Sequence, residues 1–148
     1  MATRPSKTCT FLKMARDLSE QSTCSRRNVG VIMTNRLHQI IASGYNGGAT
    51  KLQHCIDKPC AGATCKSGTG LDLCEAIHAE QNALMFCKDV GDIVSVYCTT
   101  APCTHCIKML LNTGAKHIFF IDNYPHADSA KHIWLKSNVQ RTWEQVTI

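Results

Sequence analysis

Two short segments of the sequence carry residue types that could form a catalytic metal site. One is HAE at 78–80, inside the otherwise apolar stretch CEAIHAEQNALMF, and the other is PCTHC at 102–106. Cys103 and Cys106 are three residues apart, so they can share one face of a helical turn. With His78 they would supply three ligands to zinc and leave the fourth tetrahedral position open, as in catalytic zinc sites.

Glu80 has a separate role in this hypothesis, beside the metal without binding it. Two thiolates neutralise much of the zinc charge, so a bound water is acidified less than it would be by three imidazoles. A carboxylate next to that water can accept its proton and pass it on. Residues two apart on a regular helix point to different sides. At the first turn, however, both His78 and Glu80 can reach a pocket that lies across the helix end.

Each half of the pattern alone is weak evidence. An isolated H-x-E is most often a surface pair, and an isolated C-x-x-C fits a redox pair or half of a structural zinc site. The order H-x-E, strand, P-C-x-x-C is the signature of zinc-dependent nucleobase deaminases. His105, within the C-x-x-C, is expected to be exposed or to lie behind the ligands rather than to bind metal.

The elements that must position these segments follow from periodicity and turn residues. Helices are expected at 6–22, 75–88, 103–114 and 126–137, and strands at 29–34, 38–43, 93–99, 117–121 and 139–146. GYNGG at 44–48 indicates a loop. Strand–helix–strand repeats of this length imply parallel pairing through right-handed crossovers. The predicted class is α/β: a three-layer α/β/α sandwich with a mixed five-stranded sheet that begins with an antiparallel hairpin.

Size and composition indicate one domain over residues 1–148, since the 148 residues are 44% hydrophobic and 18% charged. The sequence has neither an apolar run of about 18 residues nor a secretory signal. We therefore expect a cytoplasmic chain without a membrane partner. The net charge of +5 suits an anionic small molecule and is weak evidence for nucleic acid, which is not expected as a partner. Ten cysteines in such a chain favour metal ligation and buried thiols over disulfides.

Residues 49–74 form a cysteine-rich insertion without clear periodicity. Irregular loops of this length are usually functional, or are held by something other than a core. Cys55, Cys60, Cys65 and Cys74 lie in it or at its exit, and Cys24 precedes the first expected strand. A closed zinc site could hold such a loop. The alternative is a set of reduced thiols without a metal.

Four segments, CSRRNVGVIM, SGYNGG, IHAEQNAL and TTAPCTHCIKMLLNTGAKHIFF, resemble the deoxycytidylate deaminase family of the cytidine deaminase-like fold, from about Cys24 to Tyr124. The resemblance implies hydrolysis of deoxycytidylate (dCMP) to deoxyuridylate (dUMP), a step in deoxynucleotide supply. In it, zinc-bound water deprotonated by Glu80 attacks C4 of cytosine. No organic cofactor is needed. The alternatives are another target (dCTP, free cytidine, guanine or adenosine in transfer RNA) or a non-catalytic, zinc-stabilised nucleotide-binding domain.

The substrate is expected to contact six residues: Arg26, Arg27, Asn28, Asn46, Ala101 and Tyr124. The arginines can bind phosphate in a bidentate way, and Asn28 can add an amide donor. Two solvated arginines are the alternative. The resemblance implies that Asn46 contacts the nucleoside and that main-chain groups of Ala101 hold the base. Tyr124 follows the strand expected at 117–121 and is expected to close over the nucleotide. The alternatives are a turn residue for Asn46 and core or edge packing for Tyr124.

Further properties are implied only by the resemblance. They include a second, structural zinc held by Cys24, Cys55, Cys60 and Cys74, with His54 as the alternative ligand and Cys65 as a spare. They also include a homohexamer and an allosteric site at Gly44, Tyr45, Gly47 and Gly48. There dCTP would activate and dTTP inhibit, with Mg2+ accompanying a triphosphate. The sequence GYNGGATK lacks the proline and later glycine of the family pattern G-Y-N-G-x-P-x-G, so the effector preference stays open.

Overall fold

The fold is built on a mixed five-stranded sheet. A computed structural model describes residues 2–148. Along the sheet the strands are β2 (Ile40–Tyr45), β1 (Gly30–Thr34), β5 (Ser95–Thr100), β6 (His117–Asp122) and β7 (Thr142–Gln145). β1 is antiparallel to both of its neighbours, whereas β5, β6 and β7 are parallel. The predicted sheet, with its first hairpin, is confirmed.

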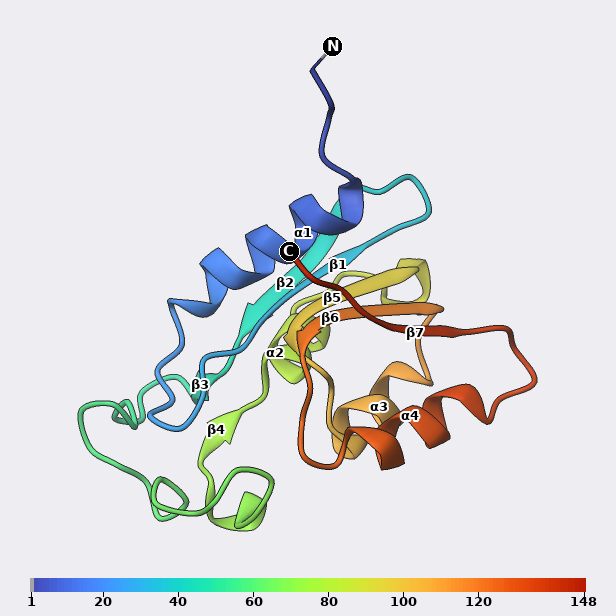
Figure 1. The fold of residues 1–148 in the computed structure, drawn as a ribbon. Coiled ribbons are helices and arrows are strands. Elements are labelled where there is room, and N and C mark those ends of the chain that lie inside the picture. The colour runs from blue at the N-terminus through green and yellow to red at the C-terminus, as the bar shows by residue number, and fades with distance from the viewer. Residues whose placement is uncertain (1) are drawn as a thin grey trace.

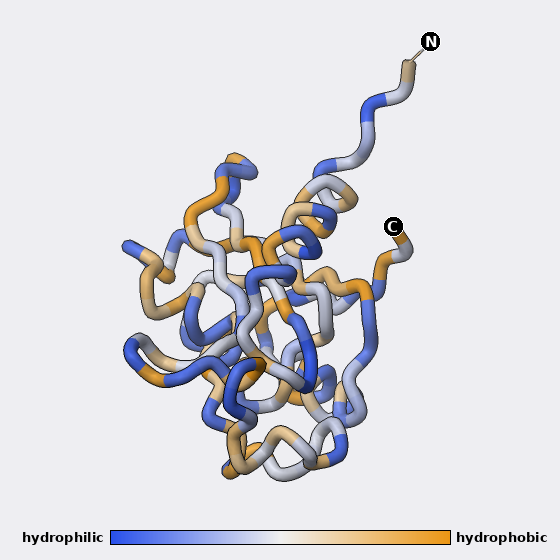
Figure 2. Tube along the Cα trace, turned by 90° about the vertical axis from the view of Figure 1, so that its left-hand side faces the viewer, coloured by the Kyte–Doolittle hydropathy of each residue, from blue (hydrophilic) through white to orange (hydrophobic). Residues whose placement is uncertain are grey.

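Helices cover both faces of the sheet, which gives the three predicted layers (Figure 1). The helix α1 (Lys7–Ser19) covers one face, and α2 (Ala79–Met85), α3 (Thr104–Leu110) and α4 (Ala127–Leu135) cover the other. Figure 2 shows hydrophobic and hydrophilic residues alternating around the coil of α1, as expected for a helix with one buried side. Within residues 2–148, no helix combines the length and the apolarity that crossing a membrane requires.

The core is divided by the sheet into two clusters. Ile32 and Tyr97 pack with α1, whereas Val31 and Val96 pack on the side of the other three helices. This division follows from the strand period, because successive side chains point to opposite faces. Both central strands are therefore buried along their whole length. On the second side, Trp134 is fully buried and its indole N–H donates to the Thr142 carbonyl at 2.9 Å, which ties α4 to β7.

Several boundaries differ from those predicted, and two of them matter to the site. The helix expected at 75–88 begins only at Ala79, because Ala76–Ile77 form a short strand, β4. GYNGG is not a loop: Gly44 and Tyr45 end β2, and Gly47–Gly48 form β3, which pairs with β4. Short apolar runs fit a helix or a strand equally well, so periodicity alone did not separate them.

The other differences are smaller. The helix expected at 103–114 ends at Leu110. Residues 49–70 contain turns but neither a helix nor a strand, and a single 3-10 turn follows at Leu71–Leu73. The chain after β7 returns to the face of α1, where Val146 and Ile148 pack against that cluster.

Gly44 lets α2 pack directly on β2. A Cβ atom there would lie 2.5 Å from the carbonyl oxygen of Ala79 and 2.8 Å from the backbone nitrogen of Ala83. We therefore expect Gly44→Ala to lower the free energy of unfolding by about 1–3 kcal/mol, the usual cost of overpacking. Denaturant titration would measure it. Ser43→Ala, at the exposed neighbouring position, should change that free energy by less than ~0.5 kcal/mol. Equal losses in both variants would contradict the packing argument.

Candidate active site

Three side chains meet where α2 and α3 begin. His78 and Cys103 are the residues that precede the two helices, and both have extended backbone, with φ/ψ of −67°/153° and −76°/169°. The Nδ1 atom of His78 lies 3.4 Å from Sγ of Cys103 and 3.4 Å from Sγ of Cys106. A tetrahedral zinc bound to sulfur and imidazole nitrogen would place those atoms about 3.5 Å apart. The three side chains therefore fit zinc, with a fourth position open.

Local hydrogen bonds keep the two helix starts in place. The backbone N–H of His78 donates to the side chain of Gln81 at 2.9 Å, so its extended conformation is part of the helix start. The backbone N–H of Ala101 donates to the Asp122 carbonyl at 2.9 Å, which continues the pairing of β5 with β6 to within two residues of Cys103. The ligands are therefore fixed by the sheet and the helix ends rather than by mobile loops.

The ligand side chains influence each other's protonation. The interaction with the Cys106 side chain, with His78 also contributing, lowers the pKa of Cys103 to about 4. The same interaction and burial raise the pKa of Cys106 above its ordinary value. The hydrogen bond to Cys103 also raises the pKa of His78, against the opposing effect of burial. Metal binding requires neutral histidine and deprotonated thiols, so zinc binding at this group would release protons.

Glu80 lies beside these ligands. It is only 4% exposed, and its Oε2 accepts a hydrogen bond from the Cys106 thiol at 3.5 Å. Burial raises the pKa of its carboxyl, with the nearby His78 acting in the opposite direction. Across residues 2–148, the only group of three or more residues placed to share a metal ion is His78, Cys103 and Cys106. Glu80 is thus a neighbour of the metal position, as the sequence predicted.

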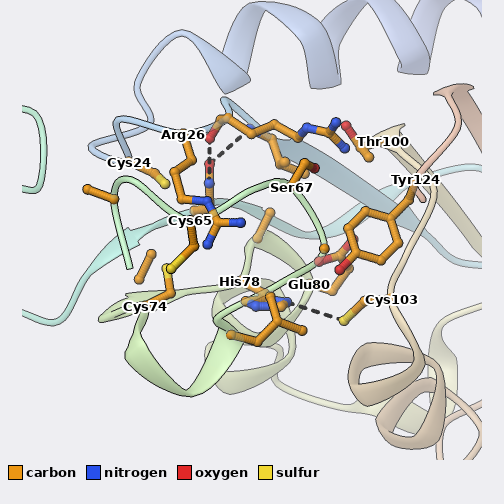
Figure 3. Close-up of a pocket in the computed structure, with 18 residues that line it drawn as sticks. Cys24, Arg26, Cys65, Ser67, Cys74, His78, Glu80, Thr100, Cys103 and Tyr124 are labelled. Atoms are coloured by element: carbon orange, nitrogen blue, oxygen red, sulfur yellow. Dashed lines mark hydrogen bonds between the residues drawn. The ribbon is translucent and has the colours of Figure 1, made fainter. Parts of the chain in front are cut away.

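A cavity of about 340 Å³ opens above this group. Its lining includes His78, Glu80, Cys103, Arg27 and Tyr124. Figure 3 shows the first three grouped together and Tyr124 near Glu80. The proposed metal ligands, a buried carboxyl group and a cationic side chain therefore share one small-molecule cavity.

Four of the six residues expected to contact the substrate line the cavity, and two do not. Arg26, Arg27, Asn46 and Tyr124 line the cavity, whereas Asn28 is exposed and Ala101 is buried, and neither belongs to the lining. The side chain of Asn46 accepts a hydrogen bond from the Val29 backbone N–H at 2.8 Å and donates to the Arg27 carbonyl at 2.7 Å. Asn46 thus orders the backbone that presents Arg27.

Sequence reasoning missed part of the lining. Thr100 lies there, in place of the neighbouring Ala101, and so do several residues of the cysteine-rich insertion: Ala63, Cys65, Ser67, Gly68 and Leu71. The insertion has neither periodicity nor a motif, so no local signal marked these residues as neighbours of the metal group. Only the length of the loop indicated a function.

Of the four cysteines expected to bind a second metal, Cys55 and Cys60 form a close pair. Sγ of Cys55 lies 3.6 Å from Sγ of Cys60. It accepts a hydrogen bond from the Cys60 backbone N–H and shares one with the Ser25 hydroxyl, and these bonds lower the pKa of Cys55 to about 7. Burial raises the pKa of Cys74, and the nearby Cys24 and Cys60 add to this effect. In residues 2–148, these thiols do not form a second group close enough to share a metal ion. The exposed His54 faces Asp57 instead, at 3.9 Å.

Comparison with known proteins gives a consistent result. The family model described as the cytidine and deoxycytidylate deaminase zinc-binding region matches residues 5–122. ComE operon protein 2 of Bacillus subtilis is 32% identical over 142 residues, which cover 93% of this chain and 70% of that protein. Deoxycytidylate deaminase of Saccharomyces cerevisiae is 32% identical over 123 residues, which cover 82% of this chain. The matched region is only 39% of the yeast protein, so this chain spans about two fifths of it.

The fold is also found in solved structures. The dCMP deaminase of the cyanophage S-TIM5, in complex with dCMP and dUMP, superposes with a TM-score of 0.72 over 97% of this chain and all of that one. The two sequences are 24% identical, so this similarity bears on the fold alone. It agrees with the cytidine deaminase-like class expected from the sequence.

The metal group can be tested by zinc content. Cys106→Ser removes one of three ligands, and we expect the purified protein to lose about one zinc per chain relative to the unmodified protein. Elemental analysis would measure the loss. Cys9→Ser is the matched control, because Cys9 lies on α1, across the sheet from the cavity, and should leave the zinc content unchanged. Equal zinc in both variants would reject the site.

Proposed function

Since the chain belongs to the cytidine and deoxycytidylate deaminase family, we propose that it is a zinc-dependent hydrolase that converts dCMP to dUMP. One observation carries the proposal: His78, Cys103 and Cys106, arranged for zinc, lie with the buried Glu80 in a cavity that also holds an arginine without a hydrogen-bond partner for one of its nitrogens. The three zinc-binding side chains and Glu80 suit the deamination of cytosine, and the arginine suits binding of the phosphate group.

Zinc held by these three residues would supply a Lewis acid that activates water at neutral pH. Glu80 accepts the proton of the attacking water, delivers a proton to N3 of cytosine, and then helps the amino group leave as ammonia. Its raised pKa suits this exchange, because a group that must both take and give a proton works best when its pKa approaches the working pH. Burial keeps Glu80 away from bulk water, which would otherwise compete for the proton.

The phosphate of the nucleotide is assigned to Arg27. Its Nη1 is buried without a hydrogen-bond partner, and its guanidinium lies 6.0 Å from the centre of the Tyr124 ring. A buried donor without a partner is costly, and an anionic ligand would satisfy it. Tyr124 would then cover the nucleotide, and Asn46 would hold the backbone of Arg27 while facing the same cavity. For Ala101 we propose contact through main-chain groups and for Asn28 an amide donor to the phosphate, although neither residue belongs to the lining.

Regulation by dCTP and dTTP, with Mg2+ on the triphosphate, is proposed at Gly44, Tyr45, Gly47 and Gly48. Gly47 and Gly48 pair with Ile77 and Ala76, the residues just before the zinc ligand His78. A nucleotide bound at β3 could therefore act on His78 through two short strands. Assays of dCMP turnover with each triphosphate would test this, and unchanged rates with both would remove the proposal.

Exposed apolar side chains and free thiols bear on assembly and location. Ile40, Met85 and Phe86 leave exposed apolar surface beside the edge strand β2, and Phe86 is 81% exposed. Such surface supports association of copies, for which we propose the hexamer, to be checked by light scattering. All ten cysteines are free, as expected for a reducing cytoplasm, which cell fractionation would test.

We also propose a second, structural zinc on Cys24, Cys55, Cys60 and Cys74. The support is the close pair formed by Cys55 and Cys60 and the proximity of Cys24 and Cys60 to Cys74. Elemental analysis should give about two zinc per chain, and Cys60→Ser should reduce this to about one. A value near one that is unaffected by Cys60→Ser would reject the second site.

The catalytic role of Glu80 gives the main test. Glu80→Gln removes the proton carrier but no metal ligand, so we expect zinc to be retained while dCMP turnover falls about 10²- to 10⁴-fold. Ammonia release and elemental analysis would measure the two quantities. The exposed Glu75, just before β4, supplies the matched control Glu75→Gln, which should retain turnover. Loss of zinc together with turnover in Glu80→Gln would point to a structural role instead.

The substrate is decided by a panel of nucleotides. Deoxycytidine, cytidine, guanine and a transfer RNA anticodon stem-loop should release ammonia much more slowly than dCMP does. Equal activity on dCMP and deoxycytidine would contradict the phosphate role of Arg27. Absence of turnover on the whole panel, with zinc bound, would favour a nucleotide-binding domain without catalysis.

A further inference from the structure

The two adjacent arginines make different contacts. Nη2 of Arg26 donates hydrogen bonds to the carbonyl oxygens of Lys66 at 2.8 Å and of Thr69 at 3.1 Å. Arg27 makes no such bond to the insertion, and its guanidinium lies over Tyr124. In Figure 3, Arg26 lies on the side of Cys65 and Cys74, away from Tyr124. The sequence predicts one role for both arginines, whereas these contacts separate them.

Arg26 holds the part of the insertion that covers the cavity. We call residues 65–71 the roof segment; Cys65, Ser67, Gly68 and Leu71 in it line the cavity. Its backbone turns through two positive φ angles, +79° at Gly68 and +60° at Gly70. A Cβ atom on Gly68 would lie 3.1 Å from the ring of His126, so the segment also lies close to the start of α4.

Little else ties the roof segment to the domain. Its other hydrogen bonds are local, such as those from the backbone and side chain of Thr69 to the Lys66 carbonyl. Within residues 2–148, the two bonds from Arg26 are the only hydrogen bonds between the roof segment and a distant part of the chain. No residue of the segment belongs to either buried core cluster. Arg26 therefore provides the hydrogen bonds that tie this segment to the rest of the domain.

The cavity is small, and few cationic groups line it. Its volume of about 340 Å³ is near the lower end of the 300–1,000 Å³ typical of small-molecule sites. Among the residues that line the cavity, the basic side chains besides His78 are those of Arg26 and Arg27, and Arg26 already donates to two backbone carbonyl oxygens. One free guanidinium matches one phosphate group. A second or third phosphate would meet the roof segment and its backbone carbonyl oxygens.

We propose that Arg26 is a specificity-determining residue that limits the substrate to a nucleoside monophosphate by holding the roof segment closed. Arg27 contacts the phosphate, and Arg26 acts through residues 65–71. This inference rests on the proposed function, because it concerns the substrate of the same site. It assigns adjacent arginines to substrate binding and to exclusion of longer phosphate chains.

The first test needs no substrate. Arg26→Gln removes the guanidinium that donates to both carbonyls, and we expect amide hydrogen exchange in residues 65–71 to accelerate about tenfold or more. Arg27→Gln is the matched control and should leave exchange in this segment unchanged. Equal exchange in Arg26→Gln and the unmodified protein would overturn the proposal, whether or not the protein is an enzyme.

The second test measures specificity. The ratio of kcat/KM for dCTP to that for dCMP should rise about tenfold in Arg26→Gln, whereas Arg27→Gln should raise KM for dCMP without raising the ratio. Gly68→Ala, which strains the roof segment at a positive φ, should raise the ratio with Arg26 intact. It keeps the proposal testable if Arg26→Gln fails to fold. A higher KM for dCMP in Arg26→Gln at an unchanged ratio would identify Arg26 as a phosphate ligand and reject the proposal.

The two proposals can fail separately. If the unmodified protein does not deaminate dCMP, the proposed function is rejected. Selectivity can then be measured as binding, by calorimetry of dCMP and of dCTP with the zinc-loaded Glu80→Gln protein. A preference for dCMP that Arg26→Gln removes would support the role of Arg26 without turnover. A preference that survives Arg26→Gln would reject that role, even in an active enzyme.

Discussion

The site depends on the meeting of two helix starts within hydrogen-bonding distance. His78 and Cys103 each occupy the extended position just before a helix, and their side chains approach to 3.4 Å. An extended residue can point its side chain across the end of its helix instead of along its side. Glu80, two residues later and already helical, can then lie beside the same point. The sheet makes this possible, because β5 delivers Cys103 and Gly44 of β2 lets α2 approach closely enough to deliver His78.

The four residues that the sequence singled out for metal chemistry do lie together, whereas their surroundings were predicted less well. Spacing and residue type identified His78, Glu80, Cys103 and Cys106, because metal ligation depends on a few side chains of fixed kind. The start of α2 was misplaced by four residues, since Ala76 and Ile77 suit either a helix or a strand. The resulting strand β4 is what gives His78 its extended backbone, so the error concerns a feature on which the site depends.

Arg26 and Arg27 show a different limit. They are identical neighbours in the sequence, and no pattern distinguishes them. The chain bends at Ser25 and Arg26, and the two guanidinium groups make different contacts, one with the insertion and the other with Tyr124. Which one does which depends on where residues 65–71 fold back, and that segment has no periodicity from which to derive its path. Contacts between irregular segments distant in sequence are set by the whole fold.

The bonds from Arg26 end on backbone oxygens, not on side chains. Every residue type offers a backbone carbonyl, so Ser67 or Leu71 can be replaced without loss of either acceptor. The inner surface of the cavity can therefore change during evolution while its closure is kept. A lineage that needs a different base or sugar could alter these positions one at a time and remain folded at every step.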